Sequence, residues 1–451
     1  MPMSTHTDAI RIRLSGGPQS ARQLTDNIGV SQPTISRALT ELGKEVVRIG
    51  AARSIQYALR DTTRGLPDIP IYRVDVEGRI RQLGTLVPVR PDGFVMCRAD
   101  GEGAAVHSGG LPWWLFDMRP QGYLGRAYAA RHGAELGLPP RLTDWTDSHA
   151  LRALLAHGHD VTGNLLLGDL ARDRFLAASV PDPIAESRKV EEYARLALEA
   201  ARGEIPGSSA GGEQPKFTAC AMTPHGPRQV IVKFSEAEEG TVTERWRDLL
   251  LAEHLALDTL REAGVPAATT QLFDHAGQRF LEVERFDRIG DLGRRALISL
   301  AALDAEFAGA GTGGWPIIAR RLASDGRISP DAAVNADLLW AFGTLIGNTD
   351  MHGGNLSFIV EHGRPHDLAP AYDMTPMAFA PRSGGGLPDT LSAAAIHAGV
   401  ANETWRRGEQ LARAFLARVM AAAGFSHRFD PCIAALERHI ETAGAKIGRL
   451  A

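Results

Sequence analysis

The chain of 451 residues lacks the features of disulfide-bonded, secreted and membrane proteins. It holds only three cysteines, Cys97, Cys220 and Cys432, which lie too far apart in sequence to predict a zinc site or a disulfide framework. No run approaches the ~20 apolar residues that a membrane-spanning helix needs. The first residues also lack the charged and then apolar pattern of a secretory signal. These absences exclude the membrane and predict a reducing cytoplasm as the compartment.

A large excess of charge of one sign is absent too, since 49 Lys and Arg stand against 53 Asp and Glu. The charge is unevenly distributed, however, because residues 1–60 hold eight basic and four acidic side chains. Hydrophobic residues at 44% and charged residues at 23% are ordinary values for globular proteins. The length exceeds one core of about 150 residues. We therefore expect a soluble multidomain chain with a basic N-terminal unit.

The basic segment, residues 1–65, has the pattern of a winged helix-turn-helix. A short helix is expected over 21–27, and a second one from Ser31 to about Leu42, with apolar residues at spacings of three and four. Two strands, 46–49 and 54–59, would form a hairpin. The candidate contacts to duplex DNA are Gln32, Thr34, Ser36, Arg37 and Arg53. A small dimerisation domain with a polar face is the alternative.

Residues 61–70 have the composition of a linker, with a glycine and two prolines. A β-rich subdomain is expected over residues 66–165. Its strands are expected at 71–76, 79–88 and 93–97. The aromatic block at 110–120 contains tandem tryptophans with no basic residue between them, which favours a packed core or a contact between domains over base stacking.

Residues 348–358 have the layout of a phosphoryl-transfer site. They place Asp350 and Asn355 five positions apart, and Asp373 follows. In kinases an aspartate orients and deprotonates the attacking hydroxyl, an asparagine holds Mg²⁺, and a later aspartate joins Mg²⁺ to the ATP phosphates. Asn, Asp and Gly also favour ordinary turns, so either acidic segment by itself could be a turn with no catalytic role. The order of apolar helix, polar loop, short strand and second aspartate favours the catalytic interpretation.

Two segments upstream could contact ATP phosphates. The loop 208–217 is rich in Gly and Ser, so it can present backbone N–H groups to phosphates, although it could also be a flexible connector. Lys233 lies near the end of an apolar strand and resembles the kinase lysine that pairs with phosphates. A solubility charge on an edge strand is the alternative. Glu244 or Glu253, on an expected helix at 243–263, could pair with this lysine.

The remaining pattern predicts a two-lobed α+β domain, with an N-lobe over 166–295 and a helical C-lobe over 296–451. The strand at 280–288 occupies the position of a kinase hinge, where backbone groups of Glu284 and Phe286 can bond adenine. Amphipathic helices are expected at 331–346, 401–423 and 430–450.

These motifs in combination resemble the HipA-type serine/threonine kinases, the toxins of bacterial toxin–antitoxin systems, over residues 70–450. The fused N-terminal helix-turn-helix resembles the YjjJ-like branch. The resemblance implies that Asp350 is the catalytic base, with Lys233 and His352 also in the catalytic set. It implies an ATP site formed by Ser209, Ala210, Gly211, Gly212, Gln214, Lys216, Lys233, Glu284 and Phe286.

The same resemblance implies further roles and partners. Asn355 and Asp373 would hold Mg²⁺, and Ser209 would be autophosphorylated to inactivate the enzyme. The substrate would be a protein with a Ser or Thr acceptor, which in this family can be an aminoacyl-tRNA synthetase. The fused DNA-binding unit leaves the need for a separate antitoxin open. A small-molecule phosphotransferase and a nucleotide-binding transcription regulator are the alternatives.

Overall fold

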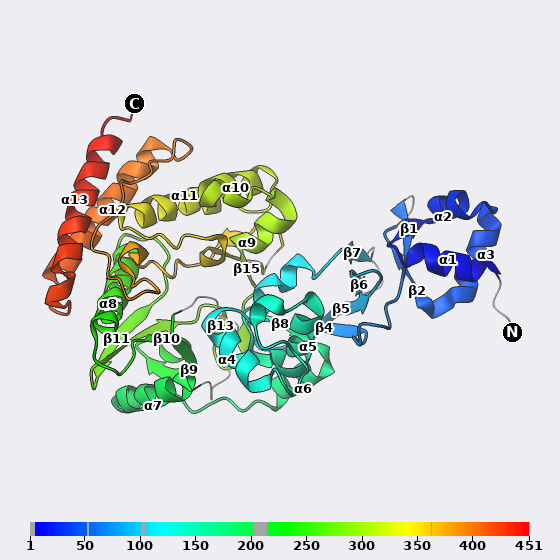
Figure 1. Cartoon of the computed structure of the whole chain (residues 1–451), viewed down its shortest axis with the longest axis horizontal. Helices are drawn as coiled ribbons and strands as arrows, with labels where there is room; N and C mark the ends of the chain where they lie inside the picture. The colour runs from blue at the N-terminus through cyan, green and yellow to red at the C-terminus, as the bar shows by residue number, and fades with distance from the viewer. Residues whose placement is uncertain (1–4, 52–53, 101–104, 203–213, 362, 451) are drawn as a thin grey trace.

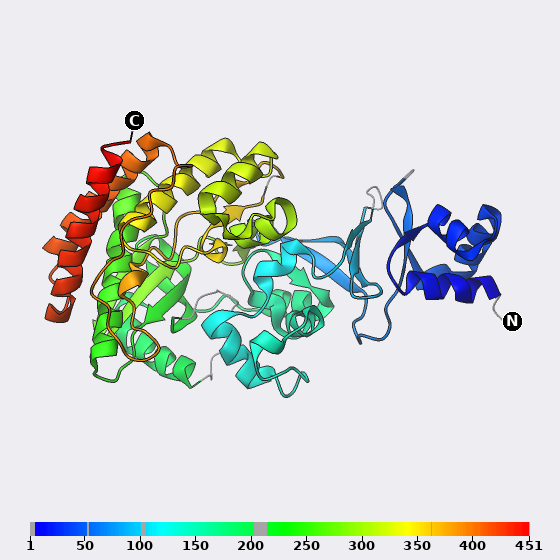
Figure 2. The ribbon, with the colours of Figure 1, turned by 45° about the horizontal axis from the view of Figure 1, so that its top comes forward.

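The computed structural model describes residues 5–51, 54–100, 105–202, 214–361 and 363–450. The molecule is elongated, with a small helical unit at one end, a β-rich unit in the middle and a larger two-lobed unit at the other end (Figure 1). The rotated view in Figure 2 shows the same order. Within the described ranges, no helix has both the length and the apolarity needed to cross a membrane.

The N-terminal unit packs three helices against a three-stranded antiparallel sheet of order β1-β3-β2. Its elements are α1 (Thr5–Leu14), β1 (Gln19–Ser20), α2 (Ala21–Ile28), α3 (Gln32–Leu42), β2 (Val46–Ile49) and β3 (Gln56–Leu59). The Ser20 side chain accepts a hydrogen bond from the Gln23 backbone N–H and so fixes the start of α2. The two expected helices and the hairpin are confirmed, and α1 is an element that the sequence analysis missed.

The middle unit is a five-stranded antiparallel sheet of order β7-β6-β5-β4-β8. Its strands are β4 (Ile69–Val74), β5 (Ile80–Pro88), β6 (Phe94–Arg98), β7 (Val106–Ser108) and β8 (Leu165–Leu167). Two helices, α5 (Asp147–His157) and α6 (Gly168–Ala177), contribute to separate apolar clusters with the sheet residues. A further helix, α4 (Gly122–His132), precedes them. The sheet extends past residue 165, where the sequence analysis divided two units.

The segment 61–70 connects the N-terminal unit to β4, as expected of a linker, and its side chains fix it against the middle sheet. The Arg64 guanidinium donates to the backbone carbonyls of Val89 at 3.0 Å and Gly93 at 2.8 Å, and to the buried Asp61 carboxylate at 2.8 Å. Gly, Pro and charged residues correctly indicated a connecting segment. Composition cannot show whether the bonding groups of a turn contact water or a neighbouring sheet.

Apolar contacts reinforce this joint between the N-terminal and middle units. Val47 and Ala58, on β2 and β3, pack with Val87 and Val95 of the middle sheet. One face of the hairpin is therefore covered by the middle unit. The position of the N-terminal unit is fixed by both hydrogen bonds and a small hydrophobic cluster.

The N-lobe is a four-stranded antiparallel sheet of order β11-β12-β10-β9. Its elements are α7 (Lys189–Ala201), β9 (Lys216–Thr223), β10 (Gly226–Phe234), α8 (Thr241–Glu262), β11 (Thr270–His275) and β12 (Gln278–Glu284). The apolar residues of α7 share a cluster with β9, β10 and β12, while α8 contacts β10, β11 and β12. Strand β10 is central, because it lies between β12 and β9.

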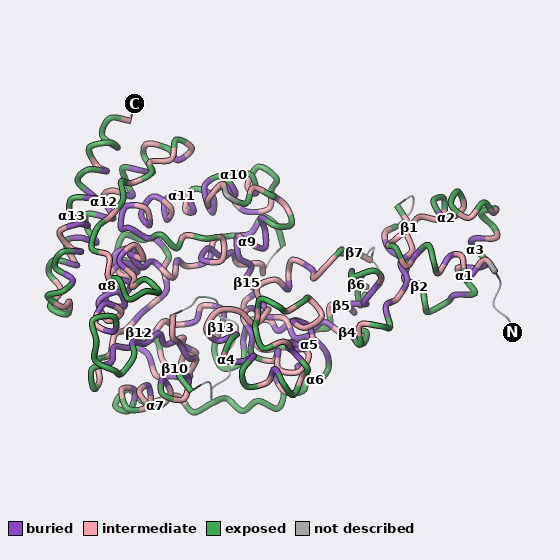
Figure 3. Tube along the Cα trace, viewed as in Figure 1, coloured by how far each residue is buried: buried purple, intermediate pink, exposed green. Residues whose placement is uncertain are grey.

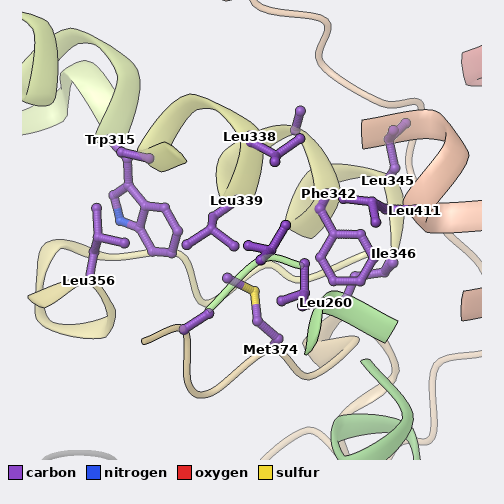
Figure 4. Packing of buried hydrophobic residues seen from close by; sticks show 14 of the residues in the cluster. Leu260, Trp315, Leu338, Leu339, Phe342, Leu345, Ile346, Leu356, Met374 and Leu411 are labelled. Carbon is purple, nitrogen blue, oxygen red and sulfur yellow. The ribbon is translucent and has the colours of Figure 1, made fainter. Parts of the chain in front are cut away.

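The C-lobe is mostly helical and contributes most residues of the largest hydrophobic cluster. Figure 3 marks the buried residues along the chain. Its helices are α9 (Leu300–Leu303), α10 (Gly314–Ser324), α11 (Pro330–Leu345), α12 (Asn402–Ala421) and α13 (Asp430–Ile447), and its sheet has β15 (Leu297–Ser299), β16 (Ser357–Ile359) and β17 (Asp367–Leu368). Leu356 and Met374 lie in this core with Trp315 and Leu339 (Figure 4). Leu356 follows Asn355 and Met374 follows Asp373 in the sequence, so core packing anchors both predicted metal ligands.

The aromatic block of the middle unit forms η3 (Trp113–Met118) and packs against the C-lobe core, which confirms the predicted contact between domains. The rings of Trp113 and Phe307 meet edge to face at 5.1 Å. The Asp117 carboxylate accepts hydrogen bonds of 2.6 Å from both the backbone N–H and the hydroxyl of Ser299. The middle unit is thus attached to the lobe that carries the phosphoryl-transfer motif.

Because Arg64 satisfies several carbonyls at the joint, we expect Arg64→Ala to lower the free energy of unfolding by about 2–4 kcal/mol. Urea denaturation followed by circular dichroism measures this loss. Arg22→Ala is the control, since the Arg22 side chain is 92% exposed and makes only a 3.9 Å ion pair. Equal stability of the two variants would contradict a fixed joint.

Candidate active site

The loop after α11 is held by Asn348, which joins the two acidic motifs. Gly347, at a φ of 78°, ends the helical run, and the buried Asn348 follows. Asn348 accepts a 2.9 Å hydrogen bond from the backbone N–H of Asp350, and its amide donates to the carbonyl of Asp373 at 3.3 Å. A single buried side chain therefore sets the spacing between Asp350 and Asp373.

Asp350 and His352 face solvent, whereas Asn355 is buried. The side chains of Asp350 and His352 are 51% and 56% exposed, and the Asp350 Oδ1 lies 3.8 Å from the His352 Nε2. The Nδ1 of His352 accepts a hydrogen bond from Gly354, and the Asn355 amide donates to the Asp350 carbonyl at 2.9 Å. The loop thus presents the Asp350 carboxylate to solvent, while hydrogen bonds within the loop hold its backbone in place.

Tyr372 fixes the other side of this loop. Its hydroxyl donates to the carbonyl of Gly354 at 2.9 Å and lies 2.7 Å from the Ser357 hydroxyl. Burial raises the pKa of Tyr372 above its ordinary value, so the phenol stays neutral. The next residue, Asp373, has a φ of 52° in the left-handed region. Non-glycine residues adopt that conformation at a cost and often do so at functional sites.

Lys233 lies between two carboxylates that come from different segments. It is 6% exposed and donates to the Glu253 Oε1 at 2.5 Å. It also forms an ion pair with Asp373. Burial by itself would lower the pKa of Lys233, but the charges of Asp373 and Glu253 raise it above its ordinary value. The lysine is therefore a buried cation on a central strand, which excludes a solubility charge on an edge strand.

The structure also decides between the two candidate glutamates. Glu253 is 1% exposed and contacts Lys233, whereas Glu244 forms a 3.2 Å ion pair with Arg428. Both glutamates lie on α8, nine positions apart in sequence. Only the direction of each side chain in the folded protein distinguishes them.

A second lysine adds positive charge beside the first. Lys216 of β9 is buried and directly opposite Lys233 of β10 in the sheet register. Burial would raise the pKa of Asp373, but Lys233 and then Lys216 hold it below its ordinary value. Asp373 is therefore ionised. Two adjacent ammonium groups on one sheet, with an ionised carboxylate beside them, provide a site that suits phosphate oxygens together with a hard cation.

The oxygen donors available for a metal are the carboxylate of Asp373 and the side-chain oxygen of Asn355, whose amide nitrogen is already engaged. Hard oxygen ligands in small number fit Mg²⁺, which keeps waters and substrate phosphates as its other ligands. Within the described residues, no group of three or more His, Cys, Asp and Glu side chains could hold a metal ion.

The predicted hinge residues have other contacts as well. The Phe286 ring lies 5.9 Å from the Tyr372 ring, next to Asp373. The Glu284 carboxylate lies 2.9 Å from the Nδ1 of His225.

Gln214 is half-buried just before β9. Ser209, Ala210, Gly211 and Gly212 lie outside the described residues, so their predicted role in an ATP site stays a prediction.

A buried ion network that the sequence analysis missed follows the hinge. Asp287 receives bidentate hydrogen bonds from Arg285 at 2.9 and 2.8 Å, and a 2.7 Å bond from Arg288. Arg288 also donates to the carbonyl of Val161 in the middle unit at 2.8 Å. Burial alone would raise the pKa of Asp287, but the two arginines hold it well below its usual range. The network ties the hinge to the middle unit.

Four of the five predicted DNA contacts lie on α3 of the N-terminal unit. Gln32, Ser36 and Arg37 of α3 are exposed, and Thr34 is half-buried with its hydroxyl 3.0 Å from that of Ser31. Arg53 lies outside the described residues.

Comparison with known proteins places the chain in a family. A model described as the YjjJ-like toxin middle domain matches residues 66–176, and one described as the HipA-like C-terminal domain matches residues 208–442. The fold resembles that of HipA in a Shewanella oneidensis MR-1 complex of HipA, HipB and operator DNA, with a TM-score of 0.53, 18% identity, and coverage of 84% of this chain and 97% of that chain. These findings define a HipA-type toxin fold.

Toxin YjjJ of Escherichia coli K12 is 38% identical over 436 residues, which cover 96% of this chain and 97% of the relative. The chain belongs to the YjjJ-like toxins of the HipA family. A proinflammatory kinase of Helicobacter pylori, CtkA, matches 53% of this chain and 93% of its own at 12% identity, but its TM-score of 0.38 is too low to carry an argument.

The Asp287 network gives a prediction on pH. Because the pKa of Asp287 is lower in the folded state than its unfolded value of about 3.9, the ion pairs contribute fully above that pH and are lost as the pH falls toward the folded value. Asp287→Asn should therefore cost about 3–5 kcal/mol at pH 7 and progressively less below pH 4.

Thermal unfolding of the variant and the parent protein across pH 2–8 measures this difference. Glu199→Gln is the control, because it removes a surface ion pair with Arg195 on α7 and should cost under about 1 kcal/mol. A difference for Asp287→Asn that grows as the pH falls would contradict the assignment.

Proposed function

We propose that this protein is a Mg²⁺- and ATP-dependent serine/threonine protein kinase of the HipA toxin type, with its own DNA-binding unit. The observation that carries the proposal is the position of Lys233. This buried cation pairs with Glu253 and with Asp373, and Asn348 links Asp373 to the loop that holds Asp350. Membership in the toxin family supports the same conclusion.

Each residue of the site has a separate role in the proposed phosphoryl transfer. Lys233 and Lys216 hold phosphate oxygens of ATP, and the ionic contacts of Lys233 fix its ammonium before ATP arrives. Asp350 orients the acceptor hydroxyl and takes its proton, since its exposed carboxylate is open to an incoming protein side chain. Asn355 and Asp373 would hold Mg²⁺, which when bound neutralises charge on the phosphate oxygens. Phe286 and the backbone near Glu284 would contact adenine.

The acceptor is proposed to be a Ser or Thr hydroxyl of a protein, and an aminoacyl-tRNA synthetase is a candidate that the family resemblance suggests. Ser209 is proposed as the site of autophosphorylation, because a phosphate there would bring roughly −1.5 to −2 charge into the glycine-rich loop and compete with ATP for its N–H groups. ATP and duplex DNA as ligands would place the protein in the cytoplasm.

We further propose that the N-terminal unit is a winged helix-turn-helix that binds duplex DNA through α3. The support is its three helices and hairpin, the exposed Gln32, Ser36 and Arg37, and its surplus of basic residues. The related Shewanella oneidensis HipA was solved with HipB and operator DNA. Here the DNA-binding unit is part of the toxin chain. A pull-down experiment with this chain tests whether a separate antitoxin also binds.

We expect Asp350→Asn and Asp373→Asn to lower phosphoryl transfer by roughly 100-fold or more, because one removes the base and the other a metal ligand. Transfer is measured with labelled ATP and Mg²⁺ in a cell lysate, followed by identification of the labelled protein. Asp367→Asn is the matched control, since Asp367 is an exposed aspartate on β17.

Full activity in either site variant would overturn the kinase assignment. Label on a small alcohol instead of a protein would favour a small-molecule phosphotransferase, and ATP binding without transfer would favour a nucleotide-binding regulator. Mass spectrometry of the same preparations tests Ser209. Its phosphate should be present in the parent protein and absent from Asp350→Asn.

The full chain should bind duplex DNA with an affinity that falls steeply as salt rises, because basic side chains displace counterions from phosphates. Arg37→Ala and Arg48→Ala should each weaken binding and reduce the slope of log affinity against log salt by about 1. Fluorescence anisotropy with a labelled duplex measures both. The control is Lys446→Ala, on α13 of the C-lobe. An affinity that does not depend on salt would favour a dimerisation role for the N-terminal unit.

A further inference from the structure

The glutamate that holds Lys233 has a second partner, Thr375. The Thr375 hydroxyl donates to the Glu253 Oε2 at 2.8 Å, while the Oε1 of the same carboxylate accepts from Lys233 at 2.5 Å. Thr375 is 5% exposed and Glu253 is 1% exposed. Each oxygen of this buried carboxylate therefore has one donor, and the two donors come from different parts of the chain.

A carboxylate that is bonded through one oxygen can rotate about that bond, whereas donors at both oxygens fix its plane. Glu253 lies in the interior of α8, so its orientation decides where the Lys233 ammonium rests. A buried oxygen without a donor is also costly, which gives Glu253 a reason to turn away if the hydroxyl is lost. The hydroxyl therefore acts on the orientation of Glu253.

Thr375 also lies two residues after Asp373, the other carboxylate that contacts Lys233. The bond from Thr375 to Glu253 consequently ties the Asp373 segment to α8. Asp373 is in the left-handed region with a φ of 52°, and its carbonyl is held from the opposite side by Asn348. The segment is thus anchored at the residue that carries the strain and again two residues after it.

We propose that Thr375 is a positioning residue whose hydroxyl orients Glu253 and so keeps Lys233 between Glu253 and Asp373. Its hydroxyl contacts the Glu253 carboxylate and acts through that residue. The consequence for phosphoryl transfer rests on the proposed kinase function, whereas the consequence for the environment of Lys233 does not. The competing explanation is a buried hydroxyl that contributes only to stability.

A double-mutant cycle tests the route of the effect. Thr375→Val keeps the shape of the side chain and removes the donor, and it should lower kcat/KM for ATP about 10-fold, the value of one hydrogen bond of ~1.4 kcal/mol. Glu253→Gln should lower kcat/KM further. If Thr375 acts through Glu253, Thr375→Val should cost nothing more in the Glu253→Gln background.

The environment of Lys233 is measured without any nucleotide. Trace acetylation with acetic anhydride, read by mass spectrometry, reports how readily the reagent reaches an amine. A Glu253 that turns away removes one of the two carboxylates that enclose the Lys233 ammonium, so the reagent reaches this amine more readily. Thr375→Val should therefore be acetylated at Lys233 several-fold faster than the parent protein.

Two controls separate positioning from general stability. Thr375→Ser restores the hydroxyl and should match the parent protein in both assays. Thr259→Val removes another buried hydroxyl from α8, one that bonds the carbonyl of Leu255 within the helix, and should change neither measurement. If Thr375→Val does not fold, as judged by circular dichroism, Thr375→Ala takes its place.

Any of three results would overturn the proposal. These are unchanged acetylation of Lys233 in Thr375→Val, additive losses in the double-mutant cycle, and a Thr375→Ser protein that is as impaired as Thr375→Val. A parent protein that transfers no phosphate would instead overturn the kinase function. The acetylation rates would then decide the role of Thr375 by themselves.

Discussion

The buried ammonium group of Lys233 is the interaction on which the arrangement of the two lobes depends. A charge with 6% exposure on a central strand is tolerated only if it is paired, and its two partners come from α8 and from the Asp373 segment. Satisfying one lysine thus fixes a strand and a helix of the N-lobe against a loop of the C-lobe. The same geometry provides a preorganised positive charge at the position where the proposed function requires an ATP phosphate.

Buried polar joints of the same kind connect the rest of the molecule. Asp287 ties the hinge to the middle unit through Arg288, and Asp117 ties the aromatic block to the start of α9. Arg64 holds the segment that follows the N-terminal unit against the middle sheet. Apolar contacts accompany the joints at Asp117 and Arg64, while the directed hydrogen bonds set the angle at which two units meet.

Much of the fold was predictable because local pattern controls it. The expected strands of the middle unit and the helices of the C-lobe are present within a few residues, since alternation and helical spacing reflect burial on one face. The exceptions have physical reasons. The helix α1 carries an exposed Ile12 and little amphipathic pattern, and the segment 61–70 has the composition of a flexible turn but bonds to a neighbouring sheet.

The sequence by itself determined the residue types of the site and their order, because Asp350, Asn355 and Asp373 are close in sequence and lie in loops next to apolar elements. The tertiary structure alone decided which glutamate pairs with Lys233, that Asn348 joins the two acidic motifs, and that Thr375 bonds Glu253. Those contacts join residues 20 to 122 positions apart. Periodicity and spacing report only on near neighbours, so pairings at such distances are set by the packing of lobes rather than by any local signal.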